Sequence, residues 1–251
     1  MTEQKLYGTV LLKATDIMDY IAQATVAPTL ADLAENLNIS KPTILKILRT
    51  LEYCDYITMQ ENDKRYYLGV KFLKYADSVT SNNSLSLAAQ ASLFELRNDI
   101  EETVNLGILQ SNSVILINKL ESPQSIKLVS TIGGKMNLYS SSLGKAMLAC
   151  FNEEQLASYL NHTPLIPLTA NTITDKGLLK ADIDLARQKG YALEKGENEP
   201  DVICVGFPLF KNNRIYGAFS ITAPAYRVDD EKIQRFVQAG KIAQSQILSK
   251  L

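Results

Sequence analysis

The side chains that could act as nucleophiles or metal ligands are few and lie far apart in the sequence. The chain of 251 residues contains three cysteines, Cys54, Cys150 and Cys204, and one histidine, His162. The cysteines form no CxxC pair and no disulfide framework, and a common zinc site needs several Cys and His ligands. Nucleophilic catalysis would depend on His162, which we expect in a surface turn at 161–164. We therefore expect no catalytic residue, no metal and no cofactor, and we keep a Cys204-dependent enzyme as an alternative.

Basic side chains are concentrated in one short part of the chain. The net charge is −1, but residues 38–76 carry three more basic than acidic side chains, whereas residues 1–37 carry three more acidic ones. Each phosphate contact releases counterions locally, so the position of positive charge matters more than its total. The stretch 40–51 contains three bases and no acid, although a solvated helix face would mix the two. This pattern favours contact with nucleic acid.

Three helices are predicted to position these bases. Apolar residues recur at helical spacing over 10–24, and a second short helix follows Thr29, a favourable N-cap residue. Ser40 is the expected N-cap of the third helix, where Pro42 fits the first turn. Two short helices joined by about four residues make a helix-turn-helix. The outer face of the third helix would present Lys41, Thr43, Lys46, Arg49 and Thr50.

A β-hairpin is expected directly after the third helix. Residues 56–60 and 65–68 are predicted as strands around a polar turn at 61–64. This arrangement is a winged helix-turn-helix, and it places Lys64 and Arg65 at the tip for phosphate or minor-groove contact. A three-helix module that binds protein or nothing is the alternative.

A second domain is expected after a connecting helix around 72–79 and a polar break at 80–84. We expect an α+β fold, because strands occur with helices before, between and after them. Small and apolar residues on the helix beginning at Leu85 suit either pairing between subunits or packing within one chain. A cap at Thr174 and a C-terminal Gly190 bound another helix. The predicted helices are 85–100, 143–151, 174–190 and 229–248, and the predicted strands are 104–109, 114–120, 126–131, 191–194, 202–210 and 214–222.

Several motifs occur in an order that resembles one known family. They are TLADLAENLNISKPT at 29–43, LRTLE at 48–52, YYLG at 66–69, LGKAMLA at 143–149, GENEPDVICVGFPLF at 196–210 and AFSITAP at 218–224. This series resembles the IclR family of bacterial transcription regulators over nearly the whole chain. The chain departs from the family pattern at Pro42 and Leu45 in the third helix, and at Tyr139, where the family has a histidine.

The resemblance implies a two-domain regulator. Residues 1–79 would form a winged helix-turn-helix domain with its connecting helix, and residues 80–251 an effector-binding domain of GAF-like fold. The implied partners are a double-stranded DNA operator, a small organic-acid-like effector and a second copy of the chain, as a homodimer or a dimer of dimers. The expected DNA-contacting residues are Thr29, Ser40, Lys41, Thr43, Lys46, Arg49, Thr50, Lys64 and Arg65.

The last hairpin can be interpreted from its alternation. A three-residue loop at 211–213 would pair Phe210 with Arg214 and Cys204 with Ser220. Small and polar residues would then share one face, which leaves space for a ligand, while large apolar residues fill the other. Free N–H groups at Ser141 and Ser142, where a helix begins, would favour an anion. With the positions that the resemblance implies, the expected effector site comprises Met136, Ser141, Ser142, Leu143, Glu194, Cys204, Ser220 and Thr222.

These observations predict a cytoplasmic DNA-binding regulator controlled by a metabolite. No apolar run approaches the ~20 residues that a membrane span needs, and the first residues lack a signal-like apolar core. A protein-interaction module without ligand control is the second alternative.

Overall fold

The computed structural model describes residues 7–81, 84–124 and 130–251. The chain divides into two compact units, residues 1–82 and 83–251, and each is considered by itself. Of the polar break expected at 80–84, Thr80 and Ser81 belong to helix α4 (Lys71–Ser81) and Ser84 begins the next helix, while residues 82–83 lie outside the described residues. Within the described residues, no helix is both long enough and apolar enough to span a membrane.

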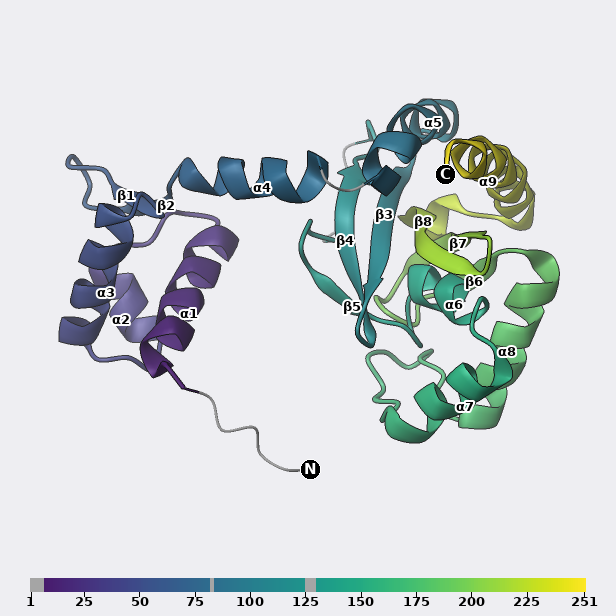
Figure 1. Ribbon diagram of the computed structural model, residues 1–251, viewed down its shortest axis with the longest axis horizontal. Helices are drawn as coiled ribbons and strands as arrows, with labels where there is room; N and C mark the ends of the chain where they lie inside the picture. Colours follow the sequence, from purple (N-terminus) through teal and green to yellow (C-terminus); the bar gives the residue numbers. More distant parts are fainter. Residues whose placement is uncertain (1–6, 82–83, 125–129) are drawn as a thin grey trace. The chain divides into compact units, whose positions relative to one another are not determined.

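The N-terminal unit is a helical core followed by a small hairpin (Figure 1). Ile17, Leu33, Ile44 and Leu48 are buried together where the helices meet, and Ile57 of the hairpin joins them. These apolar side chains recur at the spacing of one helical face, which is why each helix can bury a stripe and leave its polar side in water. The elements are α1 (Thr9–Gln23), α2 (Leu30–Asn36), α3 (Lys41–Tyr53), β1 (Ile57–Met59), β2 (Tyr66–Leu68) and α4.

The two predicted caps in this unit differ in their chemistry. Thr29 caps α2 through a capping box, in which its hydroxyl accepts from the Asp32 N–H and the Asp32 carboxylate accepts from the Thr29 N–H. Ser40 occupies the N-cap position of α3, but its hydroxyl bonds with the Thr43 hydroxyl at 2.8 Å and accepts no backbone N–H. Pro42 in the first turn lacks an N–H, so α3 has one donor fewer to satisfy there.

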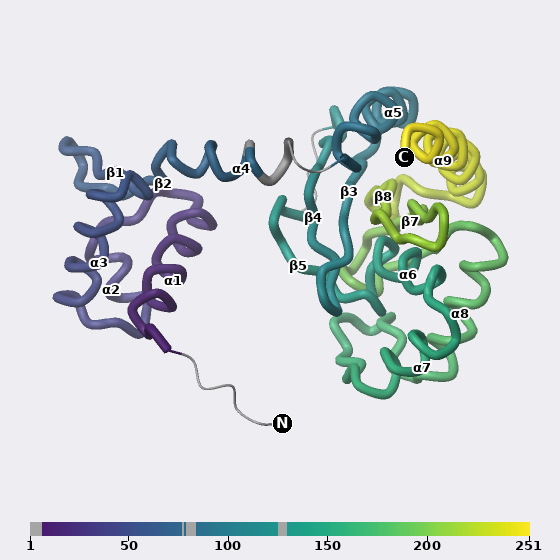
Figure 2. The backbone as a smooth tube through the Cα atoms, viewed as in Figure 1, coloured from purple at the N-terminus to yellow at the C-terminus, as the bar shows by residue number. Residues whose placement is uncertain are grey.

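The C-terminal unit is an α+β fold built on one antiparallel sheet. The strand order is β5-β4-β3-β8-β7-β6. Figure 2 shows α5 and α9 side by side on one side of this sheet and α6 with α8 on the other. The elements are α5 (Ser84–Ile100), β3 (Thr103–Gln110), β4 (Ser113–Leu120), β5 (Lys135–Asn137), α6 (Ser142–Leu148), α7 (Glu153–His162), α8 (Lys176–Lys189), β6 (Ala192–Lys195), β7 (Val202–Lys211), β8 (Arg214–Pro224), a 3-10 turn η1 (Ala225–Arg227) and α9 (Asp230–Lys250).

The apolar face of α5 packs within the chain. Leu85, Ala89, Leu93 and Leu96 are buried in one cluster with residues of the sheet and of α9. Of the two interpretations left open for this face, packing within one chain is therefore correct. Burial of this stripe accounts for the small side chains on the helix, since they let α5 approach the sheet closely.

The β7–β8 hairpin differs from its prediction in loop length and register, yet it keeps the predicted faces. The loop has two residues, Asn212 and Asn213, both with positive φ, as a tight hairpin turn requires. A bulge between Leu209 and Phe210 then shifts the pairing, so that Cys204 lies opposite Thr222. The shorter loop and the bulge compensate, because together they move the register by two residues and a shift of two preserves side-chain direction.

Other predicted boundaries also change. Asp175, and not Thr174, caps α8, while Gly190 ends it in the left-handed conformation as expected. His162 is the last residue of α7 and does not lie in a turn, and its Nδ1 bonds with the Ser158 carbonyl. The helix predicted at 143–151 ends earlier, at Leu148. The strand predicted at 126–131 falls largely outside the described residues.

Candidate functional site

The first candidate site is the outer face of α3. Ile44, Ile47 and Leu48 of this helix are buried in the N-terminal core. Helical geometry therefore turns the intervening positions outward. The side chains exposed on this face and at its N-cap are Ser40, Lys41, Lys46, Arg49 and Thr50, and Thr43 is half-buried. The three bases predicted to face DNA thus lie on the surface of the unit, with no acid between Ser40 and Leu51.

The hairpin carries two bases, of which one is exposed and the other makes contacts within the N-terminal unit. Lys64 is exposed, with φ 57, at the turn before β2. Arg65 is half-buried; its guanidinium donates to the Ala27 carbonyl and its Nε lies 3.5 Å from Asp63 Oδ2. Thr29 pairs with Arg65 through an isolated backbone bridge. Arg65 therefore ties the hairpin to the segment before α2.

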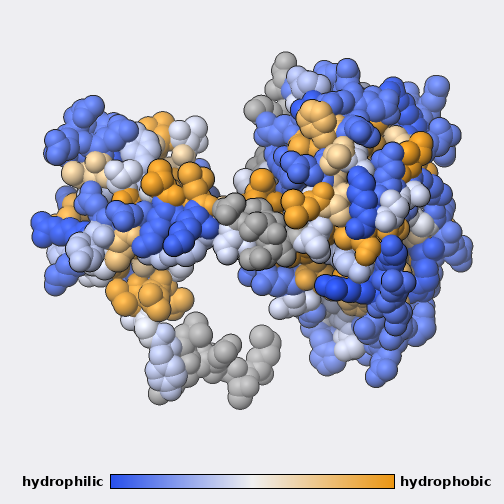
Figure 3. All heavy atoms as spheres, turned by 45° about the horizontal axis from the view of Figure 1, so that its top comes forward, coloured by the Kyte–Doolittle hydropathy of each residue, from blue (hydrophilic) through white to orange (hydrophobic). Residues whose placement is uncertain are grey.

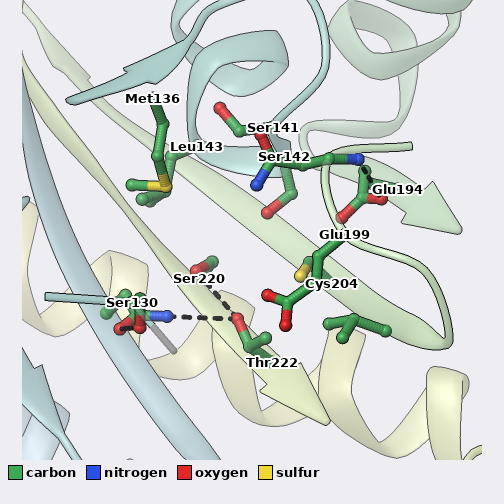
Figure 4. Close-up of a pocket in the computed structure, with 13 residues that line it drawn as sticks. Ser130, Met136, Ser141, Ser142, Leu143, Glu194, Glu199, Cys204, Ser220 and Thr222 are labelled. Carbon is green, nitrogen blue, oxygen red and sulfur yellow. Dashed lines mark hydrogen bonds between the residues drawn. The ribbon is translucent and has the colours of Figure 1, made fainter. Parts of the chain in front are cut away.

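The second candidate site is a cavity of about 50 Å³ in the C-terminal unit. It lies between the start of α6 and the polar face of β7 and β8 (Figure 4). The structure brings all eight residues expected at the effector site to its wall: Met136, Ser141, Ser142, Leu143, Glu194, Cys204, Ser220 and Thr222. Their role in binding stays a prediction.

Sequence reasoning missed five further residues of this wall, namely Asn105, Ser130, Asn198, Glu199 and Val202. Asn105 lies between Val104 and Leu106, and Val202 lies two residues before Cys204, so alternation could have assigned both to the cavity face. Asn198 and Glu199 follow Glu194 in a turn, where no periodicity indicates direction.

A hydroxyl and amide network lines the floor of the cavity. The Asn105 side chain donates to Thr222 Oγ1 at 3.2 Å, and the Ser220 and Thr222 hydroxyls lie 3.3 Å apart. Ser130 donates to the Asn105 side-chain oxygen at 3.3 Å. Hydroxyls can both donate and accept, so this floor can adapt to either kind of ligand group.

Glu194 holds the loop that closes one side of the cavity. Its Oε1 accepts the backbone N–H groups of Glu197 and, at 3.2 Å, of Asn198. Burial raises the pKa of Glu194, because the charged form loses its hydration there. Burial, and then the neighbouring Glu194 carboxylate, also raise the pKa of the Cys204 thiol. A thiol held in this state is a poor nucleophile.

The loop that follows Glu194 is also held by side chains from α6 and α8 and from the segment before α8. Lys145 of α6 is fully buried, and its Nζ lies 2.5 Å from Glu197 Oε1 and 2.8 Å from Asp182 Oδ2. The Thr169 hydroxyl donates to the Gly196 carbonyl at 2.6 Å, and the Thr172 hydroxyl donates to the Glu197 carbonyl at 2.7 Å. These bonds make the loop a preorganised wall of the cavity.

The cavity adjoins a wider cleft of about 390 Å³. Both are lined by Ser130, Met136, Asn198 and Glu199, which therefore form the boundary between the inner space and the outer one. A ligand could enter by this route and extend beyond the inner cavity. Among the described residues, no group of three or more His, Cys, Asp or Glu side chains is placed to hold a metal ion.

Comparison with known proteins yields two family models that match the chain. The model of the bacterial transcriptional regulator IclR C-terminal domain matches residues 77–248, and that of the IclR helix-turn-helix domain matches residues 10–61. The chain is 27% identical over 225 residues to the HTH-type transcriptional regulator XynR of Escherichia coli, and the match covers 89% of each protein.

Solved structures agree with these matches. The crystal structure of IclR from Thermotoga maritima superposes with a TM-score of 0.84 at 33% identity, over 97% of this chain and 98% of that one. An IclR homologue from Microbacterium hydrocarbonoxydans, solved in complex with 4-hydroxybenzoate, shares the fold with a TM-score of 0.80 at 18% identity, over 96% of this chain and 98% of that one.

Proposed function

Because this chain belongs to the IclR family of bacterial transcriptional regulators, we propose that α3 reads a DNA operator and that a small metabolite in the C-terminal cavity modulates the affinity. The exposed basic face of α3 carries this proposal. An isolated three-helix protein-binding module would not need three bases on that face without an acid. The chain would act in the cytoplasm, where operator DNA lies.

The geometry of α3 suits the major groove. A recognition helix contacts base edges with residues near its N-terminus, where Lys41, Thr43 and Lys46 lie. Arg49 and Thr50, one turn later, would contact the DNA backbone, which fixes position without carrying sequence information. Lys64 would add a phosphate contact from the hairpin, whereas Arg65 and Thr29 would act by holding the local fold.

Homodimer formation would supply the second half-site contact. Exposed apolar side chains gather at the start of α1, where Val10, Leu11 and Leu12 are exposed, and Figure 3 shows hydrophobic surface at that end of the N-terminal unit. Contiguous exposed apolar surface commonly marks a protein interface. Two recognition helices must be about 34 Å apart, or a multiple of this, to read successive turns of DNA.

Ligand control would act through that separation. A ligand shifts an equilibrium only by its difference in affinity for two states, so the metabolite would favour one spacing of the DNA-binding units. The sequence resemblance implies a small organic acid, and the homologue from Microbacterium hydrocarbonoxydans was solved with 4-hydroxybenzoate. The cavity of this chain supports a small polar ligand.

A gel-shift titration tests the DNA half of the proposal. The full-length protein is titrated against DNA upstream of its own gene at two salt concentrations, with Lys46→Ala beside it. We expect tight binding that weakens as salt rises, and weaker binding by the variant. Equal binding by both proteins would exclude α3 as the reading element and would favour the protein-interaction module.

Ligand identity is tested by mass spectrometry of the purified protein, followed by a thermal-shift panel of small metabolites. A ligand that raises the melting temperature must also change operator affinity in the gel shift. Iodoacetamide labelling tests the remaining enzyme alternative, because rapid alkylation of Cys204 at neutral pH would indicate the reactive thiolate that the raised pKa opposes.

A further inference from the structure

We propose that the cavity selects a hydrogen-bond-donating ligand that is neutral or positively charged, such as a small amino alcohol, and that Glu199 is the residue that disfavours a carboxylate. This inference rests on the proposed role of the cavity as the effector site. It narrows the ligand to a chemical class other than the organic acid that the sequence resemblance implies.

The charged side chains that line the inner cavity all have one sign, whereas Lys135 lines the adjoining cleft. Among the described residues of its wall, Glu194 and Glu199 are acidic and none is Lys, Arg or His. Two of the nearest buried groups, Glu194 and the Cys204 thiol, already have raised pKa values because burial penalises their charged forms. A further negative charge in the same space would be penalised in the same way.

Glu194 and Glu199 have different tasks. The Glu194 Oε1 is committed to two backbone N–H groups of the loop that follows it. The Glu199 carboxylate makes no hydrogen bond or ion pair with the residues that the structure describes, and it is half-buried. Figure 4 shows it directed toward Thr222 and Cys204. It is therefore available to a ligand that enters.

A carboxylate group can only accept hydrogen bonds. An ammonium or hydroxyl group on the ligand would donate to Glu199, while the Ser220 and Thr222 hydroxyls would bond with the remaining polar atoms. A ligand carboxylate would instead face another acceptor of like charge. The N-terminus of α6 would favour an anion, but its effect is small. This helix has seven residues, and the Ser141 hydroxyl already accepts the Gly144 N–H.

The position of Glu199 suits a selecting group. It lines both the inner cavity and the outer cleft, so an entering ligand passes it. The inner volume of about 50 Å³ holds only a few water-sized groups. The part of the ligand that meets Glu199 is therefore small, and a larger remainder would occupy the cleft.

Three probes of nearly equal size isolate charge from shape. Ethanolamine, ethylene glycol and glycolate carry charges of +1, 0 and −1 on the same two-carbon frame. The reporter is the methyl group of Met136, whose sulfur lies at the cavity wall (Figure 4). With 13C-methyl methionine labelling of the full-length protein, Met18 and Met59 of the N-terminal unit serve as internal references.

In the wild-type protein we expect the Met136 methyl signal to show the tightest binding for ethanolamine, weaker binding for ethylene glycol and the weakest binding for glycolate. In Glu199→Gln, which keeps the shape but removes the charge, ethanolamine should weaken about tenfold and glycolate should strengthen about tenfold, since Glu199 is partly screened by solvent. Ethylene glycol should change less than about twofold by the same reasoning. Glu95→Gln, an exposed acid on α5, is the matched control and should leave all three unchanged.

Two results would overturn the proposal. If glycolate binds wild-type protein more tightly than ethanolamine and Glu199→Gln leaves that order unchanged, the proposed ligand class is wrong, while the cavity remains a binding site. If no probe moves Met136 at high millimolar concentration, the cavity itself is not a binding site. Operator binding is tested separately by gel shift, so neither result affects the DNA half of the proposed function.

Discussion

The two candidate sites of this chain are opposite in character. The face of α3 is exposed and carries Lys41, Lys46 and Arg49 without an acid, whereas the cavity wall is concealed and carries two acids without a base among its described residues. The first would attract a long polyanion from a distance, and the second would accept a small molecule after desolvation. The exposed site therefore depends on the charge of individual side chains, whereas the concealed one depends on charge and also on how closely its walls pack.

The largest expected effect tests this dependence on fit. Gly206 of β7 lies against α6, and an added Cβ would be 2.2 Å from the Ser142 carbonyl oxygen. Gly206→Ala should therefore lower the free energy of unfolding of the C-terminal unit by about 3 kcal/mol, because backbone rather than a mobile side chain must move. Chemical denaturation of the full chain measures the loss, and hydrogen exchange assigns it to one unit.

Gly133→Ala is the control for this substitution. An added Cβ there meets nothing within 4 Å, and only the left-handed backbone, φ +81, opposes it. We expect a cost of about 1 kcal/mol. Equal losses of unfolding free energy in the two variants would show that the close contact between α6 and β7 does not make the wall of the cavity sensitive to an added methyl group.

The next effect concerns charge alone. Lys46→Ala should lower operator affinity by about 1–3 kcal/mol if Lys46 contacts a guanine, while stability should stay within about 0.5 kcal/mol because the side chain is exposed. Gel shifts at one fixed salt concentration measure the first, and thermal denaturation the second. Lys74→Ala, an exposed lysine of α4, is the matched control. Similar losses from both lysines would indicate non-specific attraction.

The two sites also differ in how far sequence could predict them. The exposed face of α3 follows from helical periodicity, since fixing Ile44, Ile47 and Leu48 inside leaves the bases outside. The cavity face followed from strand alternation, although the predicted pairing of Cys204 with Ser220 was wrong. The prediction of the cavity face is nevertheless correct, because the tight Asn212–Asn213 turn and the bulge between Leu209 and Phe210 together shift the register by two residues.

Residues outside periodic elements were not predictable in this way. Glu199 follows a loop whose path is set by Lys145, Thr169 and Thr172, which come from distant parts of the sequence. Arg65 is predicted at the hairpin tip for phosphate or minor-groove contact, and its bond to the Ala27 carbonyl could not be predicted because it depends on how the hairpin meets the segment before α2. Local pattern gives the direction of a side chain in a helix or strand, but not in a loop.

A smaller effect separates folding from DNA binding at Thr29. Thr29→Ala removes both hydroxyl bonds with Asp32 and should lower the stability of the N-terminal unit by about 1 kcal/mol, which hydrogen exchange of that unit measures. Thr29→Ser keeps the cap and should restore most of the loss. Operator affinity well below the melting temperature should change less than about twofold. A decrease in affinity with unchanged stability would place Thr29 at the DNA surface itself.

The smallest expected effect distinguishes the two bases of the hairpin. Lys64 is exposed, whereas the Arg65 guanidinium is bonded to the Ala27 carbonyl. Lys64→Ala should therefore reduce the slope of log affinity against log salt by about 0.9 for each phosphate that the protein no longer neutralises. Alanine is the right replacement, because glycine would also relieve the positive φ of 57 at this position. Arg65→Ala should leave the slope nearly unchanged and loosen the hairpin, seen as faster hydrogen exchange in β1 and β2. If Arg65→Ala lowers the slope and Lys64→Ala does not, the guanidinium leaves Ala27 on binding DNA, and the exposed surface then depends on rearrangement as much as the concealed one depends on fit.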